Sequence, residues 1–268
     1  MNYRTNFRSI RDEVSAEEWQ VRVDLAACYR LVDYYGMTDL TYNHITARVP
    51  GREHHILINL YGLTYKEITA SSLAKIDLDG EVIWKPDTDY YVNRAGYVIH
   101  GAVHRARSDV TSVLHTHTRA GIAVATQRDG LMPLTQNALR FLGRVGYHDF
   151  EGTVVEPGER ERLVAALGER DVLILRNHGL LTCGRTIPEA FLLMYTLEFA
   201  CQLQVDLLAT GVPLIPIPPH VQEKTARVLG GRGVEKSSNE GKLGPWNGQL
   251  EWDALVRRLD REDPGYRE

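Results

Sequence analysis

Two histidines separated by one residue follow an apolar run in the middle of the chain. The stretch is Val113-Leu-His-Thr-His-Thr118, and its apolar residues predict the end of a buried strand. Side chains alternate between the two faces of a strand, so His115 and His117 should point the same way. Two neutral imidazoles on one face can bind one metal ion. The pair alone is a weak indication, and a third ligand is needed.

A third histidine follows a second apolar run. Val172-Leu-Ile-Leu175 predicts another buried strand, and Arg176-Asn-His178-Gly179 comes directly after it. Three histidines without a thiolate suit Zn²⁺, Mn²⁺ or Fe²⁺. Three protein ligands leave coordination positions open, as in catalytic sites. A divalent ion with open coordination positions polarises a carbonyl group, or activates oxygen or water. It could therefore stabilise the enolate formed in C–C cleavage or the carbanion left by decarboxylation.

Composition limits the class of protein. The chain has 268 residues, 43% of them hydrophobic, and a formal net charge of -4, which is typical of one large globular domain. Basic residues are scattered, so neither nucleic acid nor a membrane surface is expected as a partner. The N-terminus shows no signal sequence, and we expect no stretch long enough to span a bilayer. The three cysteines are isolated from one another, which favours a reducing cytoplasm.

Helices and strands that could position the histidines are predicted along most of the chain. A capping box at Ser15-Ala-Glu-Glu18 begins a helix that should end near Gly36. Turns at Pro50-Gly51 and Asp79-Gly80 predict antiparallel pairs, 44–49 with 55–60 and 74–78 with 81–84. Further helices are predicted over 97–107, from 120, over 157–167, over 186–208 and over 252–259. We expect one domain over 1–225, then a flexible connector and a C-terminal helix over 226–268 that packs on the domain or on a neighbouring subunit.

A second histidine pair lies four residues apart on the predicted helix 97–107. His100 and His104 have the spacing of helical metal ligands but lack the glutamate of an HExxH motif. We therefore expect partly buried, hydrogen-bonded histidines there.

Together these motifs resemble the class II aldolase/adducin superfamily over about residues 20–210. The resemblance rests on Leu-His115-Thr-His117-Thr, on Arg-Asn-His178-Gly-Leu-Leu-Thr before a capped helix, and on Asn43-His-Ile-Thr-Ala-Arg48. It implies a three-layer α/β/α sandwich with a central mixed, largely antiparallel sheet. It also implies a homotetramer and a divalent ion on His115, His117 and His178, with zinc expected first and manganese or iron as alternatives.

The chain departs from the motifs of the sugar-phosphate enzymes in that superfamily. Gly96 stands where they have a proton-transferring glutamate, and Arg94 and Ala95 replace the preceding serines that bind phosphate. Their Thr-Pro-Ser-Gly turn appears here as Asn59-Leu-Tyr-Gly62. Their acidic tyrosine falls near Gln136 or Asn137. We therefore expect a metal site without the sugar-phosphate machinery.

The resulting hypothesis is a metal-dependent lyase that acts on a non-phosphorylated carbonyl or carboxylate compound. The alternatives are a non-catalytic, adducin-like oligomeric scaffold and a non-haem iron oxygenase. Candidate acid–base residues are His148, Tyr147 and His44, and candidate substrate-binding residues are Asn43, Arg119, Gln136, Asn137 and Arg140.

Overall fold

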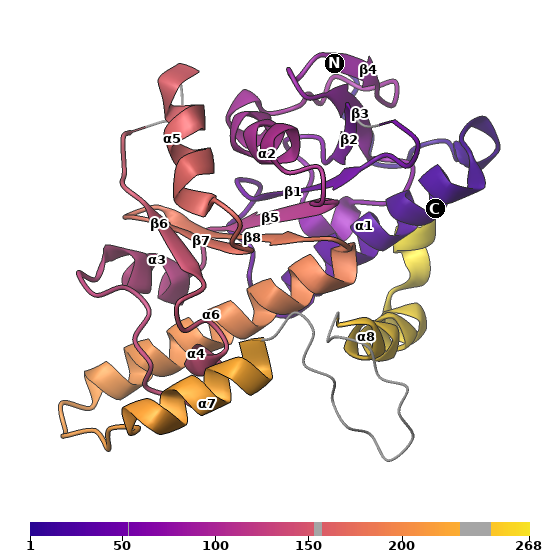
Figure 1. The fold of residues 1–268 in the computed structure, drawn as a ribbon. Coiled ribbons are helices and arrows are strands. Elements are labelled where there is room, and N and C mark those ends of the chain that lie inside the picture. Colours follow the sequence, from indigo (N-terminus) through magenta and orange to yellow (C-terminus); the bar gives the residue numbers. More distant parts are fainter. Residues whose placement is uncertain (53, 153–156, 231–247) are drawn as a thin grey trace.

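A mixed sheet forms the centre of the protein in a computed structural model, which describes residues 1–268 except 53, 153–156 and 231–247 (Figure 1). Its eight described strands run in the order β4-β3-β2-β1-β5-β8-β7-β6. β6 and β7 pair in parallel, and the other described neighbours pair antiparallel. The strands are β1 (His44–Arg48), β2 (His55–Ile58), β3 (Ala74–Asp77), β4 (Val82–Trp84), β5 (Ser112–Thr116), β6 (Val145–His148), β7 (Val172–Leu175) and β8 (Gly179–Gly184).

Helices cover both faces of this sheet, so the predicted three-layer α/β/α sandwich is confirmed (Figure 1). One face carries α2 (Arg94–Ala106) and α5 (Pro157–Leu167), which pack on each other and on the strands. The other face carries α1 (Ala16–Tyr34), α3 (Arg119–Thr126) and α6 (Ile187–Ala209). Outside these layers, α4 (Gln136–Leu139) packs on α6 and α7 (Pro219–Gly230), and α8 (Gln249–Glu262) packs on α1 and α6.

Side-chain caps fix where two long helices of the second face begin. The Ser15 hydroxyl accepts from Glu18 N at 3.1 Å, and the Thr186 hydroxyl accepts from Glu189 N at 3.2 Å. These bonds satisfy amide groups that have no partner inside the helix. α1 and α6 therefore start where the capping motifs predicted.

α6 corrects one expectation from composition. Its 23 residues are long and apolar enough to cross a bilayer by length and composition, although we expected no such stretch. Half of its most apolar part is buried in the protein, where it packs on β5, β8, α1 and α3. A core helix meets the same length criterion.

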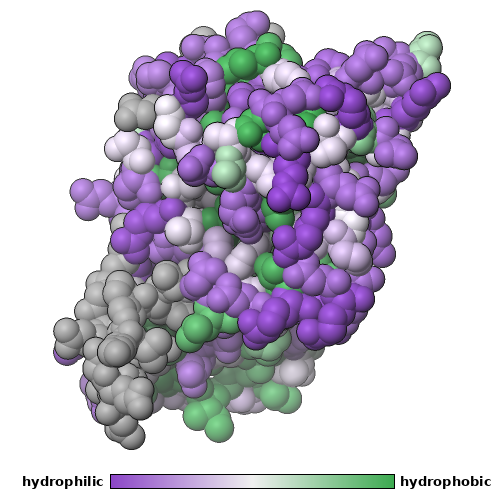
Figure 2. All heavy atoms as spheres, turned by 90° about the vertical axis from the view of Figure 1, so that its right-hand side faces the viewer, coloured by the Kyte–Doolittle hydropathy of each residue, from purple (hydrophilic) through white to green (hydrophobic). Residues whose placement is uncertain are grey.

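The face seen in Figure 2 is mostly hydrophilic, with hydrophobic groups at its lower end.

Three elements were not predicted from the sequence. β6 lies where a polar loop or pocket wall was the interpretation, since two of its four residues are Gly146 and His148. α4 has only four residues, and α7 buries only Gly230 among its members, so neither has a long apolar stripe. The predicted flexible connector falls largely on 231–247, outside the described residues.

Candidate metal centre

The three predicted ligands meet at the ends of two neighbouring structural segments. His115 lies in β5, His117 follows that strand by one residue, and His178 lies in the turn between β7 and β8. The Nε2 atoms of His115 and His117 are 2.8 Å apart, and those of His117 and His178 are 3.0 Å apart. The third separation, between His115 and His178, is 3.3 Å. The three ring nitrogens therefore point at one common centre.

A tight turn brings His178 back to β5. Asn177 adopts a left-handed conformation with φ of 58°, which asparagine tolerates better than most residues. A Cβ atom at Gly179 would lie 2.4 Å from the Thr116 carbonyl oxygen, so only glycine allows this close approach. The Arg-Asn-His-Gly sequence thus carries the ligand and the backbone freedom that places it.

The hydrogen bonds of the imidazoles set their protonation. His115 Nδ1 is 2.9 Å from the Leu180 carbonyl oxygen, which can only accept, so Nδ1 carries the proton. His117 Nδ1 is 3.3 Å from Asp39 Oδ2 and is assigned a proton for the same reason. Both Nε2 atoms therefore present lone pairs to each other. A metal ion would satisfy both lone pairs at once, so this donor set fits a divalent cation.

The distances also fit an ion. At zinc–nitrogen distances of about 2.0–2.1 Å, tetrahedral ligand nitrogens lie about 3.3–3.4 Å apart. The observed separations of 2.8–3.3 Å reach this spacing with small ring movements. Among the histidines, cysteines and carboxylates of the described residues, these three histidines are the one group whose ligand atoms lie close enough together to hold a metal ion.

Asp39 is a residue of the candidate site that the sequence did not indicate. It lies in the loop between α1 and β1, and Asn43 Oδ1 accepts from its backbone N–H at 2.7 Å. Asn43, a predicted substrate-binding residue, is only 1% exposed. Its hydrogen bond holds the loop that places the Asp39 carboxylate beside His117. A carboxylate that accepts a hydrogen bond from the second ring nitrogen of a metal-binding histidine fixes the orientation of the ring and increases its basicity. A loop aspartate has no sequence pattern that would have revealed this contact.

Burial keeps the histidines of this region neutral. Burial lowers the pKa of His115 well below its ordinary value, and neighbouring imidazoles add to the effect. Burial also lowers the pKa of His178 to about 4, with smaller contributions from His117 and His148. For His117 the effect of burial exceeds the opposing effect of Asp39, so its pKa is lowered too. Neutral imidazole is the form that binds a metal ion.

We expect the metal-free protein to lose stability in mild acid. Burial and the nearby Arg48 lower the pKa of His104 to about 3 in the folded protein. In the unfolded chain the same imidazole binds its proton near pH 6.5. The contribution of His104 to stability is therefore complete above about pH 6.5 and falls as the pH drops toward about 3, by about 1.4 kcal/mol per pH unit. Urea unfolding at pH 7.5, 6 and 5 measures this slope. An equal free energy of unfolding at pH 7.5 and 5 would contradict it.

His44 lies directly beside the cluster. It begins β1, pairs in register with His115 on β5, and its ring centroid is 5.2 Å from that of His115. Its ring also lies against Gly96 on α2, because a Cβ atom at Gly96 would meet His44 Cδ2 at 2.9 Å. The imidazole of His44 therefore fills the space that a side chain at position 96 would need.

A chain of buried polar groups leads away from His44. His44 Nδ1 is 2.8 Å from His100 Nε2, and the Thr46 hydroxyl is 2.8 Å from His100 Nδ1 and 2.9 Å from His104 Nε2. His100 and His104 are thus hydrogen-bonded within the core and do not join the three ligands. The expected hydrogen bonding is confirmed, although both residues are fully buried, at 0% and 1% exposure.

Tyr147 and His148 point in opposite directions because they are consecutive on β6. The Tyr147 hydroxyl accepts from Leu131 N at 3.1 Å, and Arg176 covers its ring at 4.2 Å from the centroid. Tyr147 therefore packs away from the cluster. His148 lines a small cavity that His178 also borders. Of this pair, only His148 lies in the neighbourhood of the metal centre.

The remaining predicted substrate-binding residues lie in two separate places. Arg119 is exposed at the first residue of α3, two positions after His117. Gln136 and Asn137 belong to α4, which packs on α6 and α7, and Arg140 donates Nη1 to the Leu229 carbonyl of α7 at 2.9 Å. The structure therefore does not bring these three residues to the histidines, and Arg119 is the one that stays near them in the chain.

A second support of the site comes from α6. The Thr118 hydroxyl caps α3 by accepting from Gly121 N at 3.2 Å, and it also donates to Glu198 Oε2. Glu198 is 4% exposed, and its other oxygen accepts from Gln202 at 2.9 Å. This buried bond fixes the residue that directly follows His117. No local sequence pattern links Thr118 to a glutamate 80 positions later.

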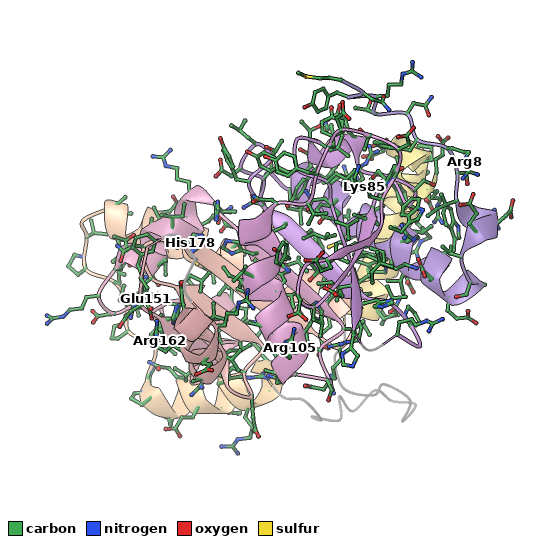
Figure 3. The ribbon with its side chains drawn as sticks, turned by 90° about the horizontal axis from the view of Figure 1, so that it is seen from above. Arg8, Lys85, Arg105, Glu151, Arg162 and His178 are labelled. Carbon is green, nitrogen blue, oxygen red and sulfur yellow. The ribbon has the colours of Figure 1, made fainter. Side chains whose placement is uncertain are left out.

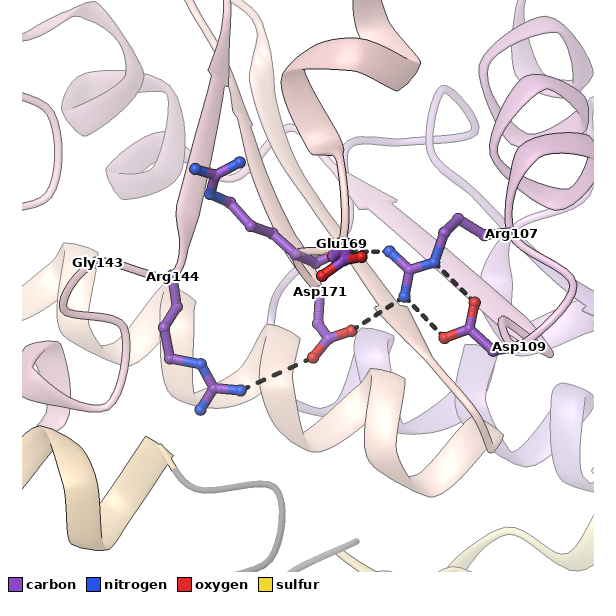
Figure 4. A pocket seen from close by; sticks show the side chains of 7 residues that line it. Arg107, Asp109, Gly143, Arg144, Glu169 and Asp171 are labelled. Atoms are coloured by element: carbon purple, nitrogen blue, oxygen red, sulfur yellow. Dashed lines mark hydrogen bonds and ion pairs between the residues drawn. The ribbon is translucent and has the colours of Figure 1, made fainter.

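A larger hollow of about 820 Å³ lies at the opposite end of β7 (Figure 4). Its walls are charged side chains that pair with each other. Arg107 binds Asp109 through Nε at 2.7 Å and Nη2 at 2.8 Å, and Asp171 lies 3.7 Å from Arg107 and 3.9 Å from Arg144. These ion pairs join the ends of α2 and β7, and the described residues that line the hollow include no histidine, cysteine, serine or threonine. In Figure 3, His178 lies on the side that carries Glu151 and Arg162.

Comparison with known proteins identifies the family. The model of the Class II Aldolase and Adducin N-terminal domain matches residues 23–205. The chain belongs to the class II aldolase and adducin family. The matched range includes the three metal-ligand candidates, His44 and Gly96, and the resemblance seen in the motifs is therefore confirmed.

Relatives of this class II aldolase family member include both bacterial proteins and adducins. A Pseudomonas aeruginosa protein, provisionally named an aldolase class 2 protein, is 49% identical over 97% of this chain and 96% of its own length. Alpha-adducin of Rattus norvegicus is 42% identical over 92% of this chain but only 34% of its own length. The family is therefore certain, while these names leave the reaction open.

Solved structures agree with the fold of the family. An aldolase II superfamily protein from Pseudomonas syringae has a TM-score of 0.87 and 46% identity, covering 97% of this chain and all of that one. An L-fuculose 1-phosphate aldolase from Glaciozyma antarctica has a TM-score of 0.79 and 27% identity, covering 98% and 96%. The mixed sheet with helices on both faces is the class II aldolase architecture.

Proposed function

We propose that this chain is a metal-dependent lyase that breaks a carbon–carbon bond in a small, non-phosphorylated carbonyl or carboxylate compound. The convergence of three histidine Nε2 atoms within 2.8–3.3 Å carries the proposal. Two of these atoms present lone pairs to each other, an arrangement that a bound cation would stabilise. The His117 side chain is 19% exposed, so the centre can be reached from solvent.

A divalent ion with open coordination positions would support this reaction type, with zinc expected first and manganese or iron as alternatives. Such an ion supplies Lewis-acid stabilisation of the negative charge that develops on a substrate oxygen. In aldol cleavage the β-hydroxyl group loses its proton, the Cα–Cβ bond breaks, and its electron pair forms the enolate of the second fragment. In decarboxylation the same pair comes from the bond to the carboxylate.

His44 is our candidate for moving the proton in this reaction. Of the three predicted acid–base residues, it lies in ring contact with a ligand histidine, at 5.2 Å between centroids. His100 holds its orientation through Nδ1. Tyr147 is engaged with Leu131 and Arg176 instead.

A substrate without phosphate is a separate part of the proposal. It rests on Arg94, Ala95 and Tyr61, which stand where sugar-phosphate enzymes of the family hold phosphate. The side chains of 94 and 95 lie outside those that the structure describes. Tyr61 bridges to Tyr91 through its backbone N–H at 2.7 Å and contacts that ring. The similarity to an enzyme named for L-fuculose 1-phosphate makes this compound the direct test.

An adducin-like scaffold is the second candidate, and the 42% identity to alpha-adducin favours it. A scaffold needs the fold and its surfaces but no metal ion. Assembly into a homotetramer and a cytoplasmic location suit both candidates and are proposals from the resemblance and the composition.

Metal analysis followed by assays decides between the candidates. The chain is prepared without a histidine tag, its bound metal is measured, and the loaded protein is tested with non-phosphorylated β-hydroxy carbonyl and β-keto acid compounds. We expect at least one ion per chain and turnover that a chelator abolishes. Metal content far below one ion per chain, without turnover, would overturn the enzyme and favour the scaffold. Efficient cleavage of L-fuculose 1-phosphate would overturn the phosphate-free substrate alone.

A further inference from the structure

Polar side chains of β1 and α2 face each other beside the metal centre. His44 and Thr46 lie two residues apart on β1, and His100 and His104 lie four residues apart on α2. Residues with these spacings share one face of a strand and one face of a helix. Two strand residues span about 6.6 Å and four helix residues about 6.0 Å, so the two pairs match in length. The strand and the helix therefore bring four polar groups together.

These four residues form a buried hydrogen-bond network. His44 Nδ1 lies 2.8 Å from His100 Nε2, and the Thr46 hydroxyl lies 2.8 Å from His100 Nδ1. The same hydroxyl lies 2.9 Å from His104 Nε2. The four residues are between 0% and 7% exposed, so solvent does not compete for these contacts. We call them the His–Thr network.

Each ring of the His–Thr network carries a single proton at neutral pH. Burial lowers the pKa of His44 and of His100 well below the ordinary value, and neighbouring imidazoles add to the effect. Burial and Arg48 lower the pKa of His104 to about 3. A neutral imidazole donates through one nitrogen and accepts through the other. The state of one nitrogen therefore fixes the state of the other nitrogen in the same ring.

The Thr46 hydroxyl couples the two histidines of α2. A hydroxyl has one proton, so it donates to one of the two ring nitrogens and accepts from the other. If it accepted from both, its own proton would be left without an acceptor in the core, which is unfavourable. The His–Thr network therefore has two arrangements, and reversing one of its hydrogen bonds reverses all three.

The far end of the His–Thr network favours one of these arrangements. Arg48 donates to the backbone carbonyls of His104 and Val110, at 2.7 and 3.3 Å, and so holds these two residues together. The Val110 carbonyl acts on the imidazole of His104, where it opposes the lowering of the pKa by burial and Arg48. A carbonyl oxygen only accepts, so it favours a proton on His104 Nδ1, which forms no regular hydrogen bond within the described residues.

The positions of the other protons follow from this end. His104 Nε2 accepts from the Thr46 hydroxyl, and that hydroxyl accepts from His100 Nδ1. His100 Nε2 then accepts from His44 Nδ1, so the lone pair of His44 is on Nε2. In the described part of the protein no hydrogen bond to this Nε2 is found. It lies 3.4 Å from the place that a Cβ atom at Gly96 would occupy.

We propose that Thr46, His100 and His104 are positioning residues that hold His44 with its proton on Nδ1 and a lone pair on Nε2. The inference rests on the proposed function, in which His44 moves the proton. In aldol cleavage Nε2 takes the proton of the substrate hydroxyl, the O–H electron pair forms the carbonyl, and the Cα–Cβ pair forms the enolate. His44 then returns the proton to the enolate carbon, which restores the neutral ring. The opposite tautomer presents an N–H to the hydroxyl group and cannot accept its proton.

Nitrogen NMR on the full-length, metal-free protein reads the tautomer directly. Protein labelled with nitrogen-15 histidine is measured at neutral pH, where the two tautomers differ in ring nitrogen shifts and in couplings to the ring protons. The signals of His44 are assigned by their loss in His44→Gln. We expect the wild-type proton on Nδ1, and a mixture of tautomers in Thr46→Val, which keeps the side-chain shape and removes the hydroxyl. A wild-type proton on Nε2, or an unchanged tautomer in Thr46→Val, would overturn the proposal.

Kinetics with the metal-loaded protein separate positioning from packing. Thr46→Val should lower kcat at least about 10-fold with little change in KM, because a general base contributes about 10²–10⁴-fold. Thr46→Ser keeps the hydroxyl and should restore both the tautomer and kcat, so an equal loss in Thr46→Ser would overturn the positioning role. Thr182→Val is the control and should change neither, since Thr182 is equally buried but donates to the Ala190 carbonyl outside the His–Thr network.

Tautomer and turnover fail separately. A wild type without turnover, with the His44 proton on Nδ1 and a mixture in Thr46→Val, would overturn the lyase while the arrangement of the His–Thr network stands. Turnover by a wild type with the His44 proton on Nε2 would overturn the positioning role alone. Thermal unfolding of each variant confirms that it is folded.

Discussion

The His117→Ala variant should lose one equivalent of bound metal and all metal-dependent turnover. His117 is one of three ligands, and its ring is the one held by Asp39 at 3.3 Å. Loss of an outer partner of a metal-bound histidine costs about 10–100-fold in affinity, so loss of the ligand itself should cost more than about 100-fold. Equilibrium dialysis against a buffered range of Zn²⁺ measures the change.

Two matched variants make this result specific. Asp39→Asn keeps the ligand and weakens its support, so we expect an affinity loss within the 10–100-fold range. His220→Ala removes an exposed imidazole on α7 and should change nothing. An unchanged affinity in His117→Ala would show that the tight ion is held elsewhere, and the lyase proposal would lose its basis.

Gly96→Ala should damage the site although it adds a single carbon atom. The new Cβ would lie 2.9 Å from His44 Cδ2 and 3.2 Å from Cγ, closer than such atoms pack. The His44 ring has little room to move, because its Nδ1 is 2.8 Å from His100 Nε2 and its ring centroid is 5.2 Å from that of His115. Overpacking of this kind costs about 1–3 kcal/mol. We expect a lower melting temperature and slower turnover.

The double variant Gly96→Ala, His44→Ala tests the cause. Removal of the ring makes room for the methyl group, so the two stability costs should fall short of additive by about 1 kcal/mol or more. Gly158→Ala in α5 serves as the control, because its added carbon meets only the end of the Arg162 side chain at 3.0 Å. Additive costs in the double variant would show that His44 and position 96 do not compete for one space.

The His44 ring occupies the space that a side chain at position 96 would need, which gives a structural reason for the glycine there. The resemblance showed that a glutamate was absent at Gly96, but not what took its place. The missing information was the pairing of β1 with β5, which sets His44 beside His115. Period-two alternation predicted that His115 and His117 share a face, and the apolar run before His178 predicted a second buried strand. Which strands are neighbours depends on the whole sheet and has no local signal.

The supporting contacts were the least predictable part of the site. Asp39 and Glu198 support the centre from a loop and from α6, at 78 and 80 positions from the residues they contact. A carboxylate in a loop or on a helix surface looks the same in the sequence whether it is buried or solvated. The ligands could be predicted because they sit at strand ends, and their supports could not because they depend on tertiary packing.

The place of β5 in the sheet has a consequence for isotope exchange. β5 pairs with β1 on one side and β8 on the other, so His115 lies on a strand with neighbours along both edges. Segments of this kind usually open only when the whole domain unfolds. Backbone amides of 113–115 should therefore exchange with deuterium at the slowest rates in the protein. The ligand strand would then be ordered before any ion arrives, and binding would need little rearrangement of the backbone.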